Sequence, residues 1–237
     1  MRTQPAKSRK MCRFWMGCLC PDCSTSTLRL YSSFPRRSAT KKSLQTQHIA
    51  NASQGQFCHS YCTYCFRWAQ FTAVGSDQQF KSNSAQALRD YIARHPLVTD
   101  VLLTGGDPMV MLSKTLRKYI IPLLRDRQTE NLTTIRIGTK SLAYWPLRYI
   151  SDPDSKDLLD LFADISRSGK HLTLQAHFSH PRELQTTAVQ EAIRLIRMTG
   201  AQIRCQAPLI RHVNDDAETW RELCTLETRL GLIPYYM

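Results

Sequence analysis

Three cysteines lie within eight residues of one another in the segment CHSYCTYC, where Cys58, Cys62 and Cys65 have the spacing C-x3-C-x2-C. The N-terminus lacks the apolar stretch of a secretory signal, and closely spaced thiols in a reducing compartment more often bind metal than form disulfides. A four-iron cluster has four irons, and an ordinary ferredoxin provides a cysteine for each. Three cysteines would leave one iron open to a small molecule, so the spacing predicts an iron–sulfur cluster that binds a ligand directly.

A structural zinc site is the alternative interpretation of this segment, with His59 as the fourth ligand. Adjacent side chains such as Cys58 and His59 can rarely point at one tetrahedral metal, and no second cysteine pair follows nearby. We therefore favour the cluster. Four further cysteines, whose spacing C-x5-C-x-C-x2-C is not a familiar zinc pattern, are Cys12, Cys18, Cys20 and Cys23.

From residue 83 onward, amphipathic helical segments alternate with short apolar runs, which is the pattern of βα units. The expected strands are residues 98–105, 133–139, 171–178, 201–210 and 232–236. The expected helices lie near residues 84–95, 113–126, 154–168, 187–199 and 216–230. Gly169, Gly200 and Gly231 each close a helix before a strand, at intervals of 31 residues. This regularity predicts an α/β fold with parallel strands, either part of a β/α barrel or an open sheet.

The carboxyl ends of parallel strands are where ligands gather in such folds. TGGDP (104–108) follows the first of these strands and GTK (138–140) follows the next. HFSHP (177–181), Gln206 and Tyr235 stand at the ends of later strands. These positions are polar, glycine-rich or aromatic while the strand bodies are apolar, so we expect a pocket where the five ends converge.

The ordered set CHSYCTYCFR, TGGDP, IRIGTK, HFSHPRE, QAPLIRHVND and GLIPYYM resembles the radical S-adenosylmethionine (SAM) enzymes of the lysine 2,3-aminomutase family. The resemblance covers about residues 53–237. It implies a partial β/α barrel of the radical SAM type, in which the open iron of a 4Fe-4S cluster holds SAM. One electron from the reduced cluster would split SAM into methionine and a 5′-deoxyadenosyl radical, which takes hydrogen from the substrate. The implied enzyme is an amino-acid isomerase that moves an amino group between adjacent carbons.

The resemblance also implies which residues surround the cluster and SAM. The implied cluster ligands are Cys58, Cys62 and Cys65. The residues implied to contact SAM are Tyr64, Gly105, Gly106, Asp107, Pro108, His177 and Gln206. The tyrosine is expected near the adenine. The GGDP segment is expected at the methionine amino group, since glycines allow close backbone approach and an acid can pair with an ammonium.

Two basic residues are matched to other ligands of the family. Arg67 is matched to an arginine that meets the substrate carboxylate, and Lys140 to a basic residue that meets pyridoxal phosphate. A lysine keeps the charge but lacks the bidentate geometry of an arginine. The segment RHVND is expected to shape a loop and to cap the following helix through Asp215.

The chain departs from the family pattern near both ends. Family members hold pyridoxal phosphate on a lysine in a glycine-rich segment, and no such lysine follows GLIPYYM (231–237). The family has an apolar strand before the cysteine loop, whereas SLQTQHIANASQGQ (43–56) is polar. We therefore expect the first barrel strand to be missing, which would expose a sheet edge, and the chain to be a fragment of a longer enzyme.

The formal net charge of +13 is concentrated near the N-terminus, because residues 1–50 contain ten Lys or Arg and a single acid. We expect residues 1–50 to be a basic, disordered tail and residues 51–237 to be the barrel. Because the positive charge lies mostly in the tail, nucleic acid is not expected to be the main partner. The sequence has no apolar run long enough to predict a membrane span. A cytoplasmic location is expected, although an acid-poor tail also suits organelle import.

Two other functions stay open at this point. One is a radical SAM enzyme without aminomutase activity, and the other is a non-catalytic protein that binds zinc or nucleic acid. The partners expected for the favoured function are a small amino-acid substrate, a reducing electron donor and a second copy of the chain.

Overall fold

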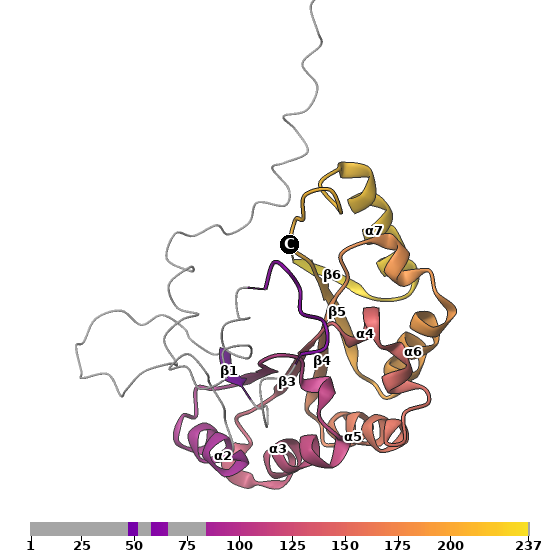
Figure 1. Ribbon diagram of the computed structural model, residues 1–237. Helices are drawn as coiled ribbons and strands as arrows, with labels where there is room; N and C mark the ends of the chain where they lie inside the picture. Colours follow the sequence, from indigo (N-terminus) through magenta and orange to yellow (C-terminus); the bar gives the residue numbers. More distant parts are fainter. Residues whose placement is uncertain (1–46, 52–57, 66–83, 237) are drawn as a thin grey trace, which may run out of the picture. The chain divides into compact units, whose positions relative to one another are not determined.

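The computed structural model describes residues 47–51, 58–65 and 84–236, which belong to one compact unit, Leu44–Met237. The described residues form a six-stranded sheet whose strands are β1 (Gln47–Asn51), β2 (Asp100–Thr104), β3 (Thr134–Thr139), β4 (His171–His177), β5 (Gln202–Gln206) and β6 (Ile233–Tyr236). Every neighbouring pair is parallel, and the spatial order β1 to β6 equals the chain order (Figure 1). A doubly wound sheet would reverse its order at a switch point. The α/β fold class is therefore confirmed, with the winding of a partial β/α barrel.

Helices connect the strands, as the apolar periodicity predicted. They are α2 (Ala85–Arg94), α3 (Ser113–Arg125), α4 (Ser141–Tyr144), α5 (Ser155–Arg167), α6 (Thr187–Met198) and α7 (Ala217–Arg229). Short 3-10 turns are η2 (Pro108–Val110), η3 (Arg127–Thr129), η4 (Pro146–Tyr149) and η5 (Pro181–Leu184). The five longer helices and β2 to β6 lie where the sequence predicted them. Within the described part of the chain, none of the helices combines the length and apolar character that crossing a bilayer requires.

The hydrophobic core lies between the helices and one face of the sheet. Alternate strand residues such as Val101, Ile135 and Leu174 are fully buried against helix residues such as Leu116 and Phe162. Side chains along a strand alternate between the two faces, so the residues between these core positions point to the opposite face. We call that opposite face the inner face; in β2 to β5 it is mostly polar, with Asp100, Arg136, Gln175, Arg204 and Gln206 among its members.

The polar segment before the cysteine loop forms a strand, so the prediction of a missing first strand was wrong. β1 pairs with β2 in unbroken parallel register, from Gln47 with Asp100 to Asn51 with Thr104. Strand pairing uses backbone N–H and C=O groups, which every residue here has, whatever its side chain. The domain boundary predicted at residues 50 and 51 falls inside β1, and the predicted tail up to residue 46 lies outside the described residues.

Two predictions concern the ends of helices. Gly169, Gly200 and Gly231 all have φ values between 72° and 88°, the left-handed conformation expected of them. The cap of α7 is Asp216 and not the predicted Asp215: the Asp216 carboxylate accepts hydrogen bonds from Thr219 N at 2.9 Å and Thr219 Oγ1 at 2.6 Å. The helix begins one residue later than its composition suggested, and the capping position moves with it.

Candidate functional site

The cysteine loop, residues 58–65, presents three free thiols that are all half-buried. Cys65 N donates to Cys62 O at 3.0 Å, which closes a turn, and Ser60 Oγ lies 2.8 Å from Cys62 Sγ. Burial raises the pKa of the Cys58 thiol, the backbone N–H groups of Ser60 and Tyr61 oppose that rise, and the charges of Asp107 and Cys62 add to it. The loop therefore holds the Cys58 thiol close to the turn that contains Asp107.

The cysteine loop offers three thiol donors but no preformed site for a single metal ion. Zinc needs all its ligands on one centre, but within residues 58–65 and 84–236 no three His, Cys, Asp or Glu side chains converge to hold a single metal ion. The exposed ring of His59, the fourth ligand of the zinc alternative, instead packs against Trp145 with ring centroids 5.2 Å apart. In a cluster each thiolate binds a different iron of one inorganic core, so the three sulfurs surround a centre larger than a single ion.

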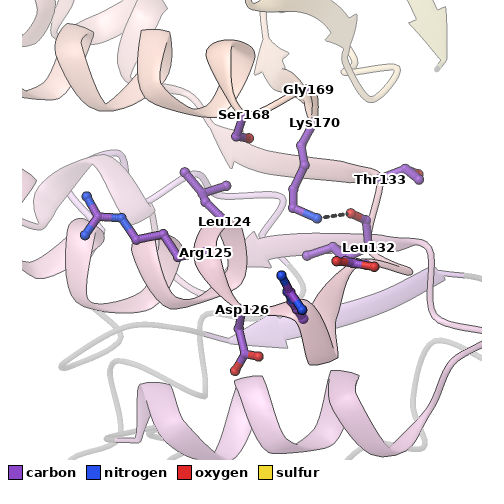
Figure 2. A pocket seen from close by; sticks show the side chains of 10 residues that line it. Leu124, Arg125, Asp126, Leu132, Thr133, Ser168, Gly169 and Lys170 are labelled. Carbon is purple, nitrogen blue, oxygen red and sulfur yellow. Dashed lines mark hydrogen bonds between the residues drawn. The ribbon is translucent and has the colours of Figure 1, made fainter.

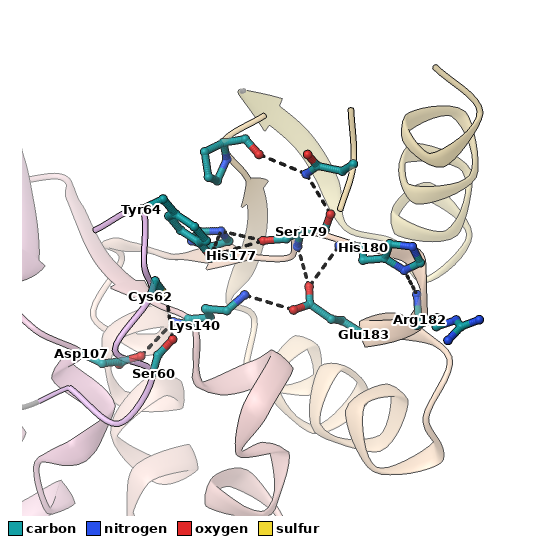
Figure 3. A network of polar contacts seen from close by, with 12 residues as sticks. Ser60, Cys62, Tyr64, Asp107, Lys140, His177, Ser179, His180, Arg182 and Glu183 are labelled. Atoms are coloured by element: carbon teal, nitrogen blue, oxygen red, sulfur yellow. Dashed lines mark hydrogen bonds and ion pairs between the residues drawn. The ribbon is translucent and has the colours of Figure 1, made fainter. Parts of the chain in front are cut away.

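The cysteine loop contacts the carboxyl end of β4 (Figure 3). Tyr64 Oη lies 3.2 Å from His177 Nε2 and 3.5 Å from Ser179 Oγ, and the rings of Tyr64 and His177 are 5.6 Å apart between centroids. Burial, first of all, raises the pKa of the Tyr64 hydroxyl, so this group stays protonated and can donate. The loop thus lies at the strand ends where the sequence predicted a ligand pocket.

Asp107 joins the end of β2 to the end of β3. Its carboxylate is 2% exposed and accepts hydrogen bonds from Thr139 Oγ1 at 2.7 Å, Met109 N at 3.0 Å, Lys140 N at 2.8 Å and Tyr144 Oη at 3.4 Å. Burial raises the pKa of this carboxyl, and the donors oppose that rise. Protein donors already occupy both oxygens, so the acid fixes the turn that contains Gly105 and Gly106.

Lys140 and Glu183 join the end of β3 to the turn after β4. Lys140 Nζ lies 3.1 Å from Glu183 Oε1, and both side chains are largely buried. Glu183 Oε2 accepts from Ser179 N at 2.5 Å and from His180 N at 3.3 Å. Glu183 was given no role in the sequence analysis, and Ser179 was included only within the strand-end segment HFSHP (177–181). The pattern of a polar cap followed three residues later by glutamate, here His180 and Glu183, is a capping-box signal that could have found them.

His177 and Gln206 are neighbours at the carboxyl ends of β4 and β5, where they are Cα partners in the sheet. Burial, and next the charge of Lys140, lowers the pKa of His177 to about 4, so the imidazole is neutral at pH 7. Its Nε2 lies 3.0 Å from Ser179 Oγ and also contacts Tyr64. The edge therefore presents two neutral polar side chains in adjacent positions.

Sequence comparison finds similar proteins among curated enzymes. No protein-family model matches the chain. It is 35% identical over 180 residues, 76% of its length, to a putative L-lysine 2,3-aminomutase of Aquifex aeolicus, of which it covers 46%. It is 31% identical over 76% of its length to L-lysine 2,3-aminomutase of Clostridium subterminale, of which it covers 40%.

The chain is homologous to lysine 2,3-aminomutases over 76% of its length. A glutamate 2,3-aminomutase of Clostridioides difficile is also similar, at 27% identity over 76% of this chain. The chain spans less than half the length of each of these curated relatives, because it covers 46%, 40% and 39% of them.

Most residues that the lysine 2,3-aminomutase motifs pointed to lie at one edge of the sheet. Tyr64, His177 and the turn at Asp107 are brought together by the contacts above, and Lys140 reaches them through Glu183 (Figure 3). Arg67 lies outside the described residues.

The segment RHVND (211–215) shapes a loop, as the sequence predicted. Asn214 is fully buried and its Nδ2 donates to Ser179 O at 2.9 Å and to Pro208 O at 3.1 Å, while its Oδ1 accepts from Ile210 N at 2.6 Å. These bonds tie the turn after β4 to the segment after β5. They keep Ser179, and with it the contacts of His177, in place.

A cavity of about 350 Å³ lies elsewhere, where the chain enters β3 and β4 (Figure 2). Its lining includes Arg125, Leu132 and Lys170, and Lys170 Nζ donates to Leu132 O at 2.5 Å and to Thr129 O at 3.1 Å. The cavity lies at the amino ends of the strands, whereas the residues matched to the lysine 2,3-aminomutases lie at the carboxyl ends. It is therefore not part of the candidate site.

Proposed function

We propose that this chain provides the cluster-binding and SAM-binding part of a radical SAM isomerase of the 2,3-aminomutase type. The observation that supports this best is the contact of the cysteine loop with the strand ends through Tyr64 and His177, at 3.2 Å, within a chain homologous to these enzymes. When bound, a reduced 4Fe-4S cluster supplies the electron that splits SAM into methionine and a 5′-deoxyadenosyl radical, which abstracts hydrogen from the substrate.

In this proposal Cys58, Cys62 and Cys65 hold the cluster as thiolates. Burial and the neighbouring charge of Asp107 raise the pKa of Cys58, so the free thiol keeps its proton at neutral pH. Binding of the cluster must then displace that proton, and loading should improve as the pH rises. Ser60, 2.8 Å from Cys62 Sγ, can donate to that sulfur and stabilise its negative charge.

The strand ends would bind SAM through neutral groups. SAM is a sulfonium cation, and a charged imidazole beside it would repel it; the low pKa of His177, about 4, removes that charge. Gln206, the Cα partner of His177, adds an amide that can donate and accept. Because Asp107 is saturated by internal donors, the ligand would meet the backbone of Gly105 and Gly106 in preference to the acid.

Lys140 would supply the positive charge for an anionic group, the phosphate of pyridoxal phosphate in the proposed full-length enzyme. Glu183 already holds its ammonium at 3.1 Å, which fixes the position of Lys140 before the ligand arrives. An amino acid is the proposed substrate, and an external reductant must provide the electron.

The test is SAM cleavage by the full chain after anaerobic reconstitution with iron and sulfide. With dithionite and SAM, we expect methionine and 5′-deoxyadenosine from the unaltered chain and from Cys224→Ala, whose cysteine lies on α7 away from the loop. Cys62→Ala should produce neither product. Equal product from Cys62→Ala, or none from the unaltered chain once iron has been incorporated, would contradict the proposal.

A further inference from the structure

The inner face of the sheet is unusually polar for the interior of a β/α barrel. Such interiors are normally filled by layers of branched apolar side chains. In β2 to β5, Leu102 is the only large aliphatic side chain among the inner-face positions, which are Asp100, Leu102, Thr104, Thr134, Arg136, Gly138, His171, Thr173, Gln175, His177, Gln202, Arg204 and Gln206. Burying polar groups without partners costs stability, and of these residues Thr173 and Gln175 are buried.

Two of these side chains contain buried atoms that have no hydrogen-bond partner among the described residues. They are Gln175 Oε1, an acceptor, and Arg204 Nε, a donor, and the Gln175 side chain belongs to a residue that is 4% exposed. Folded proteins leave few such atoms unpaired, and those that persist call for a reason. The two residues are Cα partners across β4 and β5, so their unpaired atoms belong to one place on the face.

This pair lies directly below the residues proposed to contact SAM. The next inner-face pair toward the carboxyl ends is His177 with Gln206. Two residues along a strand span roughly 7 Å, which is about the length of a small amino acid. A substrate bound at Gln175 and Arg204 would therefore lie next to the proposed cofactor.

The charges of the inner face favour an anion. Asp100 pairs with Arg136 at 2.8 Å, and Arg204 is a second guanidinium close enough to act on the same carboxylate. Arg204 also lies over the ring of Tyr235, 5.3 Å from its centroid. In the described part of this face a single carboxylate thus serves two guanidinium groups, which leaves a surplus of positive charge.

We propose that Gln175 and Arg204 form a subsite for an amino acid with an acidic side chain, such as glutamate. A carboxylate of the ligand pairs with Arg204, and its ammonium donates to Gln175 Oε1. Lysine would instead add a second ammonium to a face that already has surplus positive charge. This inference rests on the proposed function, and it selects between the two substrate types that the names of the relatives contain, lysine and glutamate.

Calorimetric titration of the full chain with L-glutamate and with L-lysine tests the proposal. L-glutamate should bind more tightly than L-lysine, and Arg204→Gln should weaken L-glutamate binding about 10- to 100-fold, the usual effect of losing a hydrogen bond to a charged group. Arg221→Gln is the matched control, because Arg221 is an exposed arginine of α7 that pairs with Glu218 on the same helix. It should leave binding unchanged.

Gln175→Leu gives a second measurement that is informative whether or not Arg204→Gln folds. Leucine removes the unpaired acceptor at similar size, so this variant should melt at a higher temperature than the unaltered chain and bind L-glutamate more weakly. A structural role alone predicts no change in ligand binding.

Three results would overturn the subsite: tighter binding of L-lysine, no binding of either amino acid to the folded chain, or undiminished L-glutamate binding by Gln175→Leu. Cleavage of SAM to 5′-deoxyadenosine without any substrate is measured separately on the same preparation. If the chain binds L-glutamate but does not cleave SAM, the proposed function alone is refuted. If the chain cleaves SAM but does not bind L-glutamate, the subsite alone is refuted.

Discussion

Glu227 gives a quantitative prediction about stability. It lies on α7, is 3% exposed, and faces Cys205 of β5, whose thiol donates to its carboxylate. Burial raises the pKa of Glu227 from 4.5 to about 7, and the hydrogen bond opposes part of this rise. Burial likewise raises the pKa of Cys205 and of Cys224, so both thiols stay protonated and do not titrate in this range.

The sign of the effect follows from proton binding. Between pH 4.5 and about 7 the folded chain keeps the Glu227 proton that the unfolded chain has released, so stability falls as the pH rises and is level above that window. Each pKa unit corresponds to about 1.4 kcal/mol, so a shift of this size costs about 3 kcal/mol of unfolding free energy at pH 8.

Glu227→Gln tests this pH dependence, because the glutamine side chain has the same shape as glutamate and does not titrate in this pH range. The difference in unfolding free energy between the variant and the unaltered chain, measured by urea denaturation, should grow in the variant's favour by about 3 kcal/mol from pH 4.5 to pH 8. Glu218→Gln, on the exposed side of the same helix, is the control. A difference for Glu227→Gln that does not change with pH would refute the argument.

Three further predictions concern residues that fix the site. Asp107→Asn should lower the unfolding free energy by about 1–3 kcal/mol, because an amide NH2 would face the N–H donors of Met109 or Lys140; Asp160→Asn, at an exposed position, should not. NMR titration should show the imidazole of His177 neutral down to about pH 4, and protonation near pH 6.5 would contradict its burial. Arg148→Met should cost about 3–5 kcal/mol, because it leaves Asp154 without the guanidinium that pairs with it at 2.5 Å; a change below about 1 kcal/mol would contradict this.

The sequence was sufficient to predict the parts of the fold that depend on local periodicity. Helices such as α6, residues 187–198, can be predicted because their apolar residues recur at three- and four-residue spacing, and glycines such as Gly200 mark their ends. β1 was missed because the segment that contains it, residues 43–56, is polar overall, while the pairing of β1 with β2 uses only the backbone. Asp215 was predicted as the cap of α7 in place of Asp216, because composition does not locate the start of a helix to within one residue.

The site was predictable to the extent that its residues follow strand ends. Tyr64 and His177 are 113 residues apart in the chain and meet at 3.2 Å, although neither motif predicts the contact itself. The saturation of Asp107 and the ion pair between Lys140 and Glu183 depend on side-chain geometry between neighbouring strand ends, which no local pattern specifies. The unpaired atoms of Gln175 and Arg204 likewise arise only once the register of β4 and β5 is fixed.

The central claim is that Cys58, Cys62 and Cys65 hold a four-iron cluster with one iron open to SAM. Electron paramagnetic resonance of the anaerobically reconstituted, dithionite-reduced full chain tests it most directly. We predict the signal of a reduced 4Fe-4S cluster that changes when SAM is added and is absent from Cys62→Ala. A full-strength cluster signal that SAM leaves unaltered, or a chain that takes up one zinc and no iron, would contradict the account.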